Sequence, residues 1–288
     1  MAKENYIFLI GQVLKEPKIK RDEDGNPMRA SFGLTTLRRD KYDRAGNFAP
    51  KWDRPAILTG VPELMKIIED IEVNDFVEVK GTVTTKDFTK KTICPYCGAE
   101  QHTNSMMTFI NPVYIFKRGH ADSRTDGLPY LSAVAEASNI LKIVGRVCKE
   151  PTLYAYDDGT KCCTYPLAVN RKLYVQGSEN EEDHSDYPWV KSFGEQAEEN
   201  YAALDVNSLV YIDGYIRTVK RSQDLQCANP ECGKIYSTPN TVMEAIPYAT
   251  EYLADCMLPD ATHVSKADAA LAETVDAAVN ASEGGESD

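Results

Sequence analysis

The sequence predicts an all-β protein built from two tandem Greek-key barrels, each with one short helix. One observation is a repeat: GQVLKEPKI begins at Gly11, and GRVCKEPTL begins at Gly145. A second is that each copy divides into five strand-like runs separated by Gly, Pro and Asp-Gly turns. A third is that apolar residues recur every three or four positions in one stretch of each copy, as in a helix.

The repeat extends over more than the opening phrase, and its markers keep their order. The matching segments are DG at 24–25 and 158–159, FGLTTLRR (32–39) and YPLAVNRK (165–172), VNDFVEVKGTVTT (73–85) and VNSLVYIDGYIRT (206–218), and NPVYI (111–115) and IPYAT (246–250). Chance composition does not keep such markers in register, so we interpret the chain as a tandem duplication.

The elements follow in the same order in both copies. The first strand is NYIFLIGQV or NILKIVGRV, with a Gly where a bent strand has no room for a side chain. The second is RASFGLTTL or CTYPLAVN, and the third is RPAILTG or WVKSFG. A helix follows in VPELMKIIEDI or EQAEENYAAL, before the fourth strand, DFVEVKGTVTT or SLVYIDGYIRT. The fifth strand is MMTFINPVYIF or TVMEAIPYATEYL. Five strands with a helix between the third and fourth is the order of the OB-fold.

Length and composition agree with two small domains. The chain has 288 residues, of which 42% are apolar, and no run approaches the length of a membrane span. We expect a first OB-fold at 1–118, a linker at 119–137, a second OB-fold at 138–258, and a largely disordered, acidic, Ala-rich tail at 259–288. The chain is expected to be cytoplasmic.

The net charge of −12 is unevenly spread. Residues 1–130 carry 20 Lys and Arg against 18 Asp and Glu, whereas residues 131–288 carry 12 against 26. Much of the acidic excess lies in SENEEDHSD (178–186) and in the segment after Glu251. A basic binding face can therefore coexist with the acidic total.

The second copy resembles bacterial and phage single-stranded DNA-binding proteins (the SSB family). The likeness lies in IVGRVCKEPTLYAYDDGTKCCTYPLAVNRKLY and WVKSFGEQAEENYAALDVNSLVYIDGYIRT, and fainter traces lie in GLTTLRR, KWDRPAILTG and DFVEVKG. The resemblance implies single-stranded DNA as ligand, a role in replication, recombination or repair, and a bacterial cell, or a virus encoding the protein, as source. Two-barrel members dimerise, which implies a homodimer, and their acidic tails recruit replication and repair proteins.

Single-strand binding needs cations along a groove and aromatic planes on which bases stack. Both kinds of residue occur at matched places in the two copies, although strand-end cations are often merely solvated and a Trp in a barrel is often part of the core. The predicted DNA-binding residues are Arg38, Arg39, Trp52, Arg54, Lys86, Phe88, Lys90, Lys91, Arg171, Lys172, Tyr174, Tyr187, Trp189, Lys191, Arg217, Lys220 and Arg221.

Two cysteine pairs lie between the fourth and fifth strands of their copies: CPYC at 94–97 and CANPEC at 227–232. A redox dithiol would need the first pair at a helix N-terminus, but the following sequence lacks helical spacing. Both pairs instead resemble zinc knuckles, so we predict that Cys94, Cys97, Cys227 and Cys232 bind Zn²⁺. One shared four-cysteine site is the simplest closure; separate sites completed by His102 or by a second chain are the alternative.

No nucleophile elbow or Gly-rich phosphate loop is present, so the sequence predicts a binding protein and not an enzyme. The acidity of the second half also permits a different function, namely a zinc-stapled OB-fold scaffold for protein partners in a replication or repair complex. The repeated sets of basic and aromatic residues favour sequence-nonspecific single-stranded DNA binding.

Overall fold

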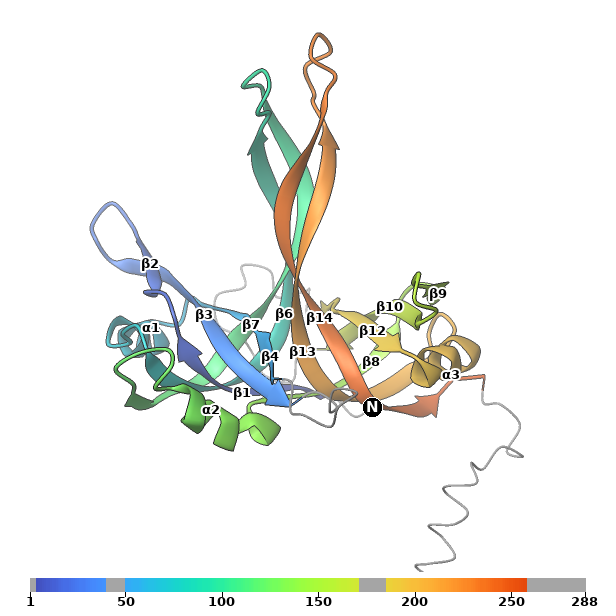
Figure 1. The fold of residues 1–288 in the computed structure, drawn as a ribbon, viewed down its shortest axis with the longest axis horizontal. Coiled ribbons are helices and arrows are strands. Elements are labelled where there is room, and N and C mark those ends of the chain that lie inside the picture. The colour runs from blue at the N-terminus through green and yellow to red at the C-terminus, as the bar shows by residue number, and fades with distance from the viewer. Residues whose placement is uncertain (1–3, 40–49, 171–184, 258–288) are drawn as a thin grey trace, which may run out of the picture.

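The computed structural model describes residues 4–39, 50–170 and 185–257, and strands dominate it (Figure 1). The first barrel contains β1 (Asn5–Val13), β2 (Lys18–Arg21), β3 (Pro27–Arg39), β4 (Pro50–Asp53), β5 (Ala56–Thr59), α1 (Pro62–Glu69), β6 (Asp75–Ile93) and β7 (Glu100–His120). The second contains β8 (Asn139–Val147), β9 (Thr152–Ala155), β10 (Lys161–Asn170), β11 (Ser185–Asp186), β12 (Trp189–Phe193), α3 (Glu195–Ala203), β13 (Leu209–Gln226) and β14 (Ile235–Ala254). The predicted all-β class is confirmed.

Each barrel closes on itself in the predicted order. In the first, β1 pairs with β3 and β6, β3 pairs with β5, β6 pairs with β7, and one parallel bridge from Ile57 to Ile110 joins β5 to β7. In the second, the equivalent parallel bridge joins Val190 to Ala245. Closure leaves each barrel without an open sheet edge along its five main strands.

Gly11 and Gly145 explain the phrase with which the repeat begins. At these positions β1 and β8 bend to pair with strands on both sides. A Cβ atom on Gly11 would lie 2.5 Å from the backbone oxygen of Thr35, and one on Gly145 would lie 2.8 Å from that of Ala168. No other residue fits without moving the backbone, so the duplication kept both glycines.

The two barrels are joined edge to edge by antiparallel pairing of β1 with β8. Within each barrel, a buried asparagine at the start of the seam strand extends its pairing with the fourth strand, in the same way in both copies. The side chain of Asn5 both donates to and accepts from the backbone of Val83, at 2.9 Å in each case. The side chain of Asn139 does the same with Ile216, at 2.8 and 3.0 Å. The result is one continuous sheet with an approximate twofold relation between its halves.

The fourth and fifth strands are much longer than the sequence patterns predicted. The runs predicted to end at residues 85 and 218 continue to Ile93 and Gln226, and each pairs with its neighbour along its whole length. Figure 1 shows the two hairpins, β6–β7 and β13–β14, rising together from the barrels. The predicted cysteine knuckles lie at their tips.

The second half of the predicted linker is largely helical and packs on the first barrel. It contains α2 (Leu128–Ala133) and a short 3-10 turn, η1 (Ala135–Ala137). The ring centroids of Tyr130 and Phe76 lie 4.4 Å apart, and Leu131 is buried beside Leu37. The predicted domain limits stay predictions, and the tail from residue 258 lies outside the described residues. No helix in the described ranges is long and apolar enough to cross a membrane.

Candidate nucleic-acid interface and metal centre

Each barrel holds the hairpin of the other through a buried aspartate. Asp53, at the end of β4 in the first barrel, accepts a 2.9 Å hydrogen bond from the backbone N–H of Thr218 on β13. Asp186, on β11 in the second barrel, accepts a 2.7 Å bond from the backbone N–H of Thr85 on β6. The hairpins are therefore fixed at their bases by reciprocal contacts between the barrels.

The residues after these aspartates repeat the pattern. The backbone N–H of Arg54 donates to the hydroxyl of Thr218 at 2.8 Å, and that of Tyr187 donates to the hydroxyl of Thr85 at 2.9 Å. Arg54 and Tyr187 are thus equivalent, and Trp52 is not the counterpart of Trp189. The two tryptophans, both predicted to precede the third strand of their copy, therefore occupy different environments.

The four predicted metal ligands meet at the hairpin tips. The Sγ atoms of Cys94, Cys97, Cys227 and Cys232 all lie within 4.8 Å of one another. The Sγ atoms of Cys97 and Cys227 are 3.6 Å apart, and those of Cys94 and Cys232 are 4.0 Å apart. Two Zn–S bonds of about 2.3 Å at a tetrahedral angle place sulfurs about 3.8 Å apart. The cluster therefore has the donor set and spacing of one shared four-cysteine site.

Hydrogen bonds from the backbone of the first knuckle favour the thiolate form of Cys94. Burial alone would raise the pKa of Cys94, but hydrogen bonds from the backbone at Tyr96 and Cys97 lower the pKa to about 7. For Cys227, a bond from the backbone at Asn229 lowers the pKa, but burial and the adjacent sulfurs raise it to about 12. Such a cluster can carry several thiolates only if a cation balances their charge.

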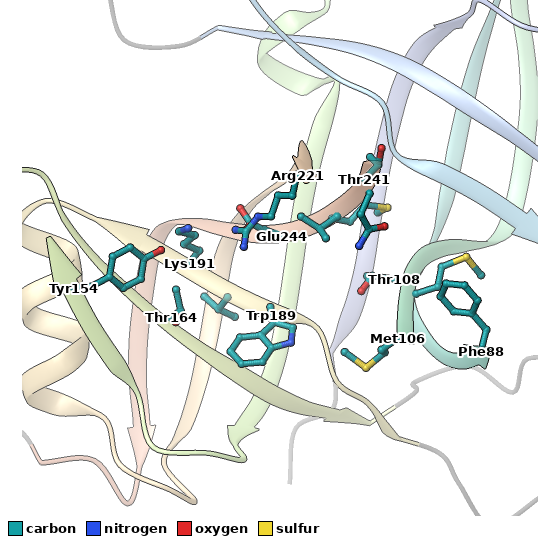
Figure 2. A pocket seen from close by; sticks show the side chains of 15 residues that line it. Phe88, Met106, Thr108, Tyr154, Thr164, Trp189, Lys191, Arg221, Thr241 and Glu244 are labelled. Atoms are coloured by element: carbon teal, nitrogen blue, oxygen red, sulfur yellow. The ribbon is translucent and has the colours of Figure 1, made fainter. Parts of the chain in front are cut away.

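A groove lies below the hairpins, on the outer face of the second barrel. Its volume is about 550 Å³, and both hairpins and the second barrel line it. In the view of Figure 2, Phe88 and Met106 of the first hairpin lie on one side, Tyr154 and Lys191 lie on the other, and Trp189 is between them. We call this cavity the inter-hairpin groove. Trp189, Phe88 and Tyr154 are 40%, 38% and 37% exposed, so large aromatic surfaces face solvent there.

A cation lies among rings at one end of the groove. The Nζ atom of Lys191 is 5.3, 5.6 and 5.7 Å from the ring centroids of Tyr154, Tyr156 and Phe193. Lys191 is buried, and cation–π contacts with these rings replace the water that would surround an exposed ammonium group. Rings and cation together form a platform on which a planar base can stack beside a phosphate.

The predicted cations Arg217 and Arg221 on β13 are paired with a carboxylate. Arg217 donates to Glu244 at 2.7 Å, and Arg221 donates to the other oxygen of the same carboxylate. The guanidinium of Arg217 also lies 4.7 Å from the ring centroid of Phe193. These contacts hold the predicted residues Arg217 and Arg221 in place at the base of β13.

Two predicted residues of the first barrel are largely structural in position. Arg38 is buried, forms a 2.6 Å ion pair with Asp53, and lies 4.2 Å from the ring centroid of Tyr215. Trp52 is half-buried and packs in the cluster with Leu37, under α2. Both side chains are therefore largely in contact with the protein itself. Their predicted contacts with DNA are untested.

The remaining predicted residues spread over both hairpins and barrels. Lys86, Lys220, Arg54 and Tyr187 are exposed. Lys91 pairs with Glu100 at 2.6 Å. Lys90 donates to the backbone oxygen of Pro239 at 3.2 Å, which links the two hairpins. Arg39 is the last residue of β3, and Arg171, Lys172 and Tyr174 lie outside the described residues.

Sequence reasoning missed part of the groove. In TLYAYDD, Tyr154 lies on β9 and Tyr156 is the first residue after that strand, and Phe193 ends β12. Alternating aromatics on a short edge strand were a usable signal. Met106 gave no such signal, because its place in the groove depends on the first hairpin lying against the second barrel.

The equivalent face of the first barrel has different chemistry. Matching bridges and turns place Lys20 where the second barrel has Tyr154, and Asp22 where it has Tyr156. Trp189 likewise corresponds to Ala56 in the third strand. The aromatic platform therefore belongs to the second barrel, and the three equivalent positions on the first barrel carry no ring.

Comparison with known protein families gives a match to the second barrel. Residues 138–229 match the family model described as "Single-strand binding protein family", so the predicted resemblance is confirmed for the second barrel. No curated protein sequence matches the chain.

Two solved structures share the fold. The wild-type single-stranded DNA binding protein from Thermus aquaticus has 15% sequence identity and a TM-score of 0.54, over 92% of this chain and all of that one. A deletion mutant of that protein has 16% identity and a TM-score of 0.56, over 89% of this chain and 98% of that one. The likeness covers both barrels, so both are OB-folds in the SSB arrangement.

Proposed function

We propose that this chain binds single-stranded DNA without strong sequence preference, and that its bases stack in the inter-hairpin groove. The observation that carries the proposal is the groove itself: Trp189, Tyr154 and Phe88 expose ring surface beside Lys191 on an OB-fold. Each stacked base contributes about 1–3 kcal/mol, and stacking tolerates any base. The SSB family match at 138–229 and the two Thermus aquaticus structures support the same ligand.

The phosphates would follow the exposed cations of the hairpins. Lys86 and Lys220 lie on the first and second hairpin, and both are exposed near the groove end of these strands. A strand with its bases in the groove would pass between these ammonium groups.

Titration of labelled oligo-dT at two salt concentrations tests the function. Log affinity should fall with log salt with a slope of roughly −0.7 for each phosphate contacted. Duplex DNA of the same length should bind far more weakly, because its bases are already stacked. Equal affinity for duplex and single strand, or no binding at all, would refute the proposal.

We also propose that the four cysteines hold one structural Zn²⁺. The sulfur spacing and the all-thiolate donor set favour zinc over hard cations, which prefer oxygen ligands. The ion would fix the tips, as Asp53 and Asp186 fix the bases. The groove would then lie between two hairpins that are held at both ends.

The resemblance extends the proposal to a cellular role. A protein of this kind would protect and organise single strands in replication, recombination or repair, in the cytoplasm, and would not act as an enzyme. Its acidic tail would contact replication or repair proteins. The scaffold alternative, in which the barrels bind only proteins, rests on the charge of −14 carried by residues 131–288. It predicts no oligo-dT binding, so the same titration separates the two functions.

A further inference from the structure

The four cysteines at the hairpin tips differ in their access to solvent. Cys94 and Cys227 are buried, with 1% and 6% of their surface exposed, and Cys232 is half-buried. Cys97 is exposed. A thiolate is oxidised only where the oxidant can reach it, so Cys97 is the tip sulfur that a small oxidant in solution meets first.

Two close sulfur contacts cross from one hairpin to the other. The Sγ atom of Cys97 lies 3.6 Å from that of Cys227, and the Sγ atom of Cys94 lies 4.0 Å from that of Cys232. The two contacts share no sulfur atom. Because a disulfide bond is about 2.05 Å long, each pair needs to close by no more than about 2 Å, and both bonds can exist together.

Contacts without sulfur hold the hairpins together beside these pairs. The hydroxyls of Thr92 and Tyr236 lie 3.3 Å apart, and both residues are buried. The backbone N–H of Ala228, in the second knuckle, donates a 2.9 Å hydrogen bond to the side chain of Gln101 on the first hairpin. These contacts keep the facing sulfurs close to each other whether or not a metal ion binds them.

Given the proposed metal site, on which this inference rests, we propose that Cys97 is a site of oxidation by peroxides. Oxidation there converts the metal site into two disulfide bonds across the hairpins, Cys97–Cys227 and Cys94–Cys232. Covalent bonds then hold the tips together in place of the ion.

The first bond forms in two balanced steps. The thiolate of Cys97 attacks one oxygen of hydrogen peroxide, the O–O bond breaks and hydroxide leaves, so that a sulfenic acid forms. The thiolate of Cys227 attacks the sulfur of this acid, the S–S bond forms and a second hydroxide leaves. The two sulfurs together lose two electrons, which reduce the peroxide. A second peroxide oxidises Cys94 and Cys232 in the same way.

The first disulfide also ends metal binding. Only Cys94 and Cys232 then remain as thiolates, and two thiolates leave zinc half coordinated. The ion is therefore released while the hairpins stay joined. A chelator has a different result, because it removes the ion and leaves reduced tips without a covalent link. A dithiol reductant returns the sulfurs to thiolates, so the exchange is reversible.

Peptide mapping of the oxidised full chain identifies the sulfur pairs. The purified protein is treated with hydrogen peroxide, its free thiols are alkylated, and it is cleaved without reductant by trypsin, chymotrypsin and a glutamate-specific protease. Cleavage at Lys, Arg, Tyr and Glu places the four cysteines on separate peptides, namely 92–96, 97–100, 222–231 and 232–234. Mass spectrometry should find 97–100 linked to 222–231, and 92–96 linked to 232–234.

Metal release should accompany the first disulfide. A chromogenic zinc chelator should report about one ion per chain, in step with the yield of the Cys97–Cys227 bond, and should report none before peroxide is added. Cys148 is the control within the same sample, because it is half-buried and lies outside the tips. It should still be alkylated at the peroxide dose that links the hairpins.

The peptide map and the metal content separate the possible failures. Disulfides within a knuckle, or a bond between Cys94 and Cys227, would overturn the proposal, as would oxidation of Cys148 before the tips. A chain that holds zinc but forms no tip disulfide would overturn it too and leave the metal site intact. A chain purified without zinc would refute the metal site, and with it the release of the ion, while the map would still decide the sulfur pairing.

Discussion

The interior of the two barrels and their groove-facing surfaces have diverged to different extents since the duplication. Inside, the two copies keep the same residues in the same contacts: Asp53 and Asp186 each hold a backbone N–H at the base of the opposite hairpin, at Thr218 and Thr85. These contacts are reciprocal, so the loss of one aspartate would release a hairpin that belongs to the other barrel.

At the surface, the equivalent positions have separated. Tyr154 and Trp189 of the second barrel correspond to Lys20 and Ala56 of the first. The difference teaches that both barrels need the same frame, whereas the proposed base stacking would need only one barrel and the hairpin that reaches it. The first barrel contributes to the groove through Phe88 and Met106 of its hairpin.

The largest effect is expected at the tips, where the two copies contribute equally. Cys97→Ser in the first knuckle or Cys232→Ser in the second should each reduce the metal content from about one ion per chain to near zero, because neither pair can hold zinc alone. Elemental analysis of purified protein measures this. Two ions per wild-type chain, or half the metal left in either variant, would indicate separate sites.

Removal of a hairpin anchor should have the next largest effect. Asp53→Ala removes a 2.6 Å ion pair with the buried Arg38 and takes away the acceptor of the Thr218 N–H. We expect the free energy of unfolding to fall by about 3–5 kcal/mol. Urea denaturation measures it, with Asp87→Ala on the exposed part of β6 as the control. An Asp53→Ala chain as stable as the control would show that the anchor is unimportant.

Loss of one ring from the platform should weaken DNA binding more modestly. Tyr154→Ala removes a ring that lines the groove and also shields Lys191. The affinity for oligo-dT should fall by about 1–3 kcal/mol. Tyr201→Ala, on α3, is the matched exposed tyrosine and should bind like wild type. Fluorescence anisotropy separates the outcomes; equal loss in both variants would argue against stacking at Tyr154.

The smallest effect concerns the acid sensitivity that Asp75 gives to the first barrel. Burial would raise the pKa of Asp75, but hydrogen bonds from Lys117, the backbone N–H of Glu72 and His120 outweigh it and lower the pKa. In the second barrel, Ser208 occupies the position equivalent to Asp75, and its hydroxyl accepts a hydrogen bond from the backbone N–H of Asp205. A serine hydroxyl does not titrate in this pH range.

Because the folded-state pKa of Asp75 is lowered, its ionised form stabilises the fold above the ordinary carboxyl pKa of 3.8, and this stability is lost as the pH falls below that value. Asp75→Ser should therefore lower the melting temperature at pH 7, and the gap from wild type should narrow below about pH 4. Ser208→Ala should show a gap that does not change with pH. A constant gap for Asp75→Ser would contradict this account.

Much of this architecture could be predicted because it depends on local signals. Gly11 and Gly145 marked the strand bends, and the spacing of the cysteine pairs marked the knuckles. The repeat itself suggested that two half-sites form one metal centre. Strand order and the helix position followed from periodicity within each copy.

What could not be predicted depends on neighbours that are distant in sequence. Arg38 and Trp52 were predicted to contact DNA, which stays a prediction; the sequence did not indicate that Arg38 pairs with Asp53 or that Trp52 packs under α2. Phe88 lines a groove on the opposite barrel because its hairpin is long enough to reach that barrel. The predicted fourth strand ended about eight residues too early, before Phe88, so the sequence did not indicate this position. Register along a hairpin is a property of the pair and not of one strand.

The chain contains two tryptophans, and they test the central claim directly because one lies on each barrel. Trp52→Phe leaves Trp189 as the sole emitter, and Trp189→Phe leaves Trp52. If bases stack on the second barrel alone, saturation with oligo-dT should strongly quench the fluorescence of the Trp52→Phe chain and leave that of the Trp189→Phe chain almost unchanged. Equal quenching in both variants, or quenching in the Trp189→Phe chain only, would contradict the account.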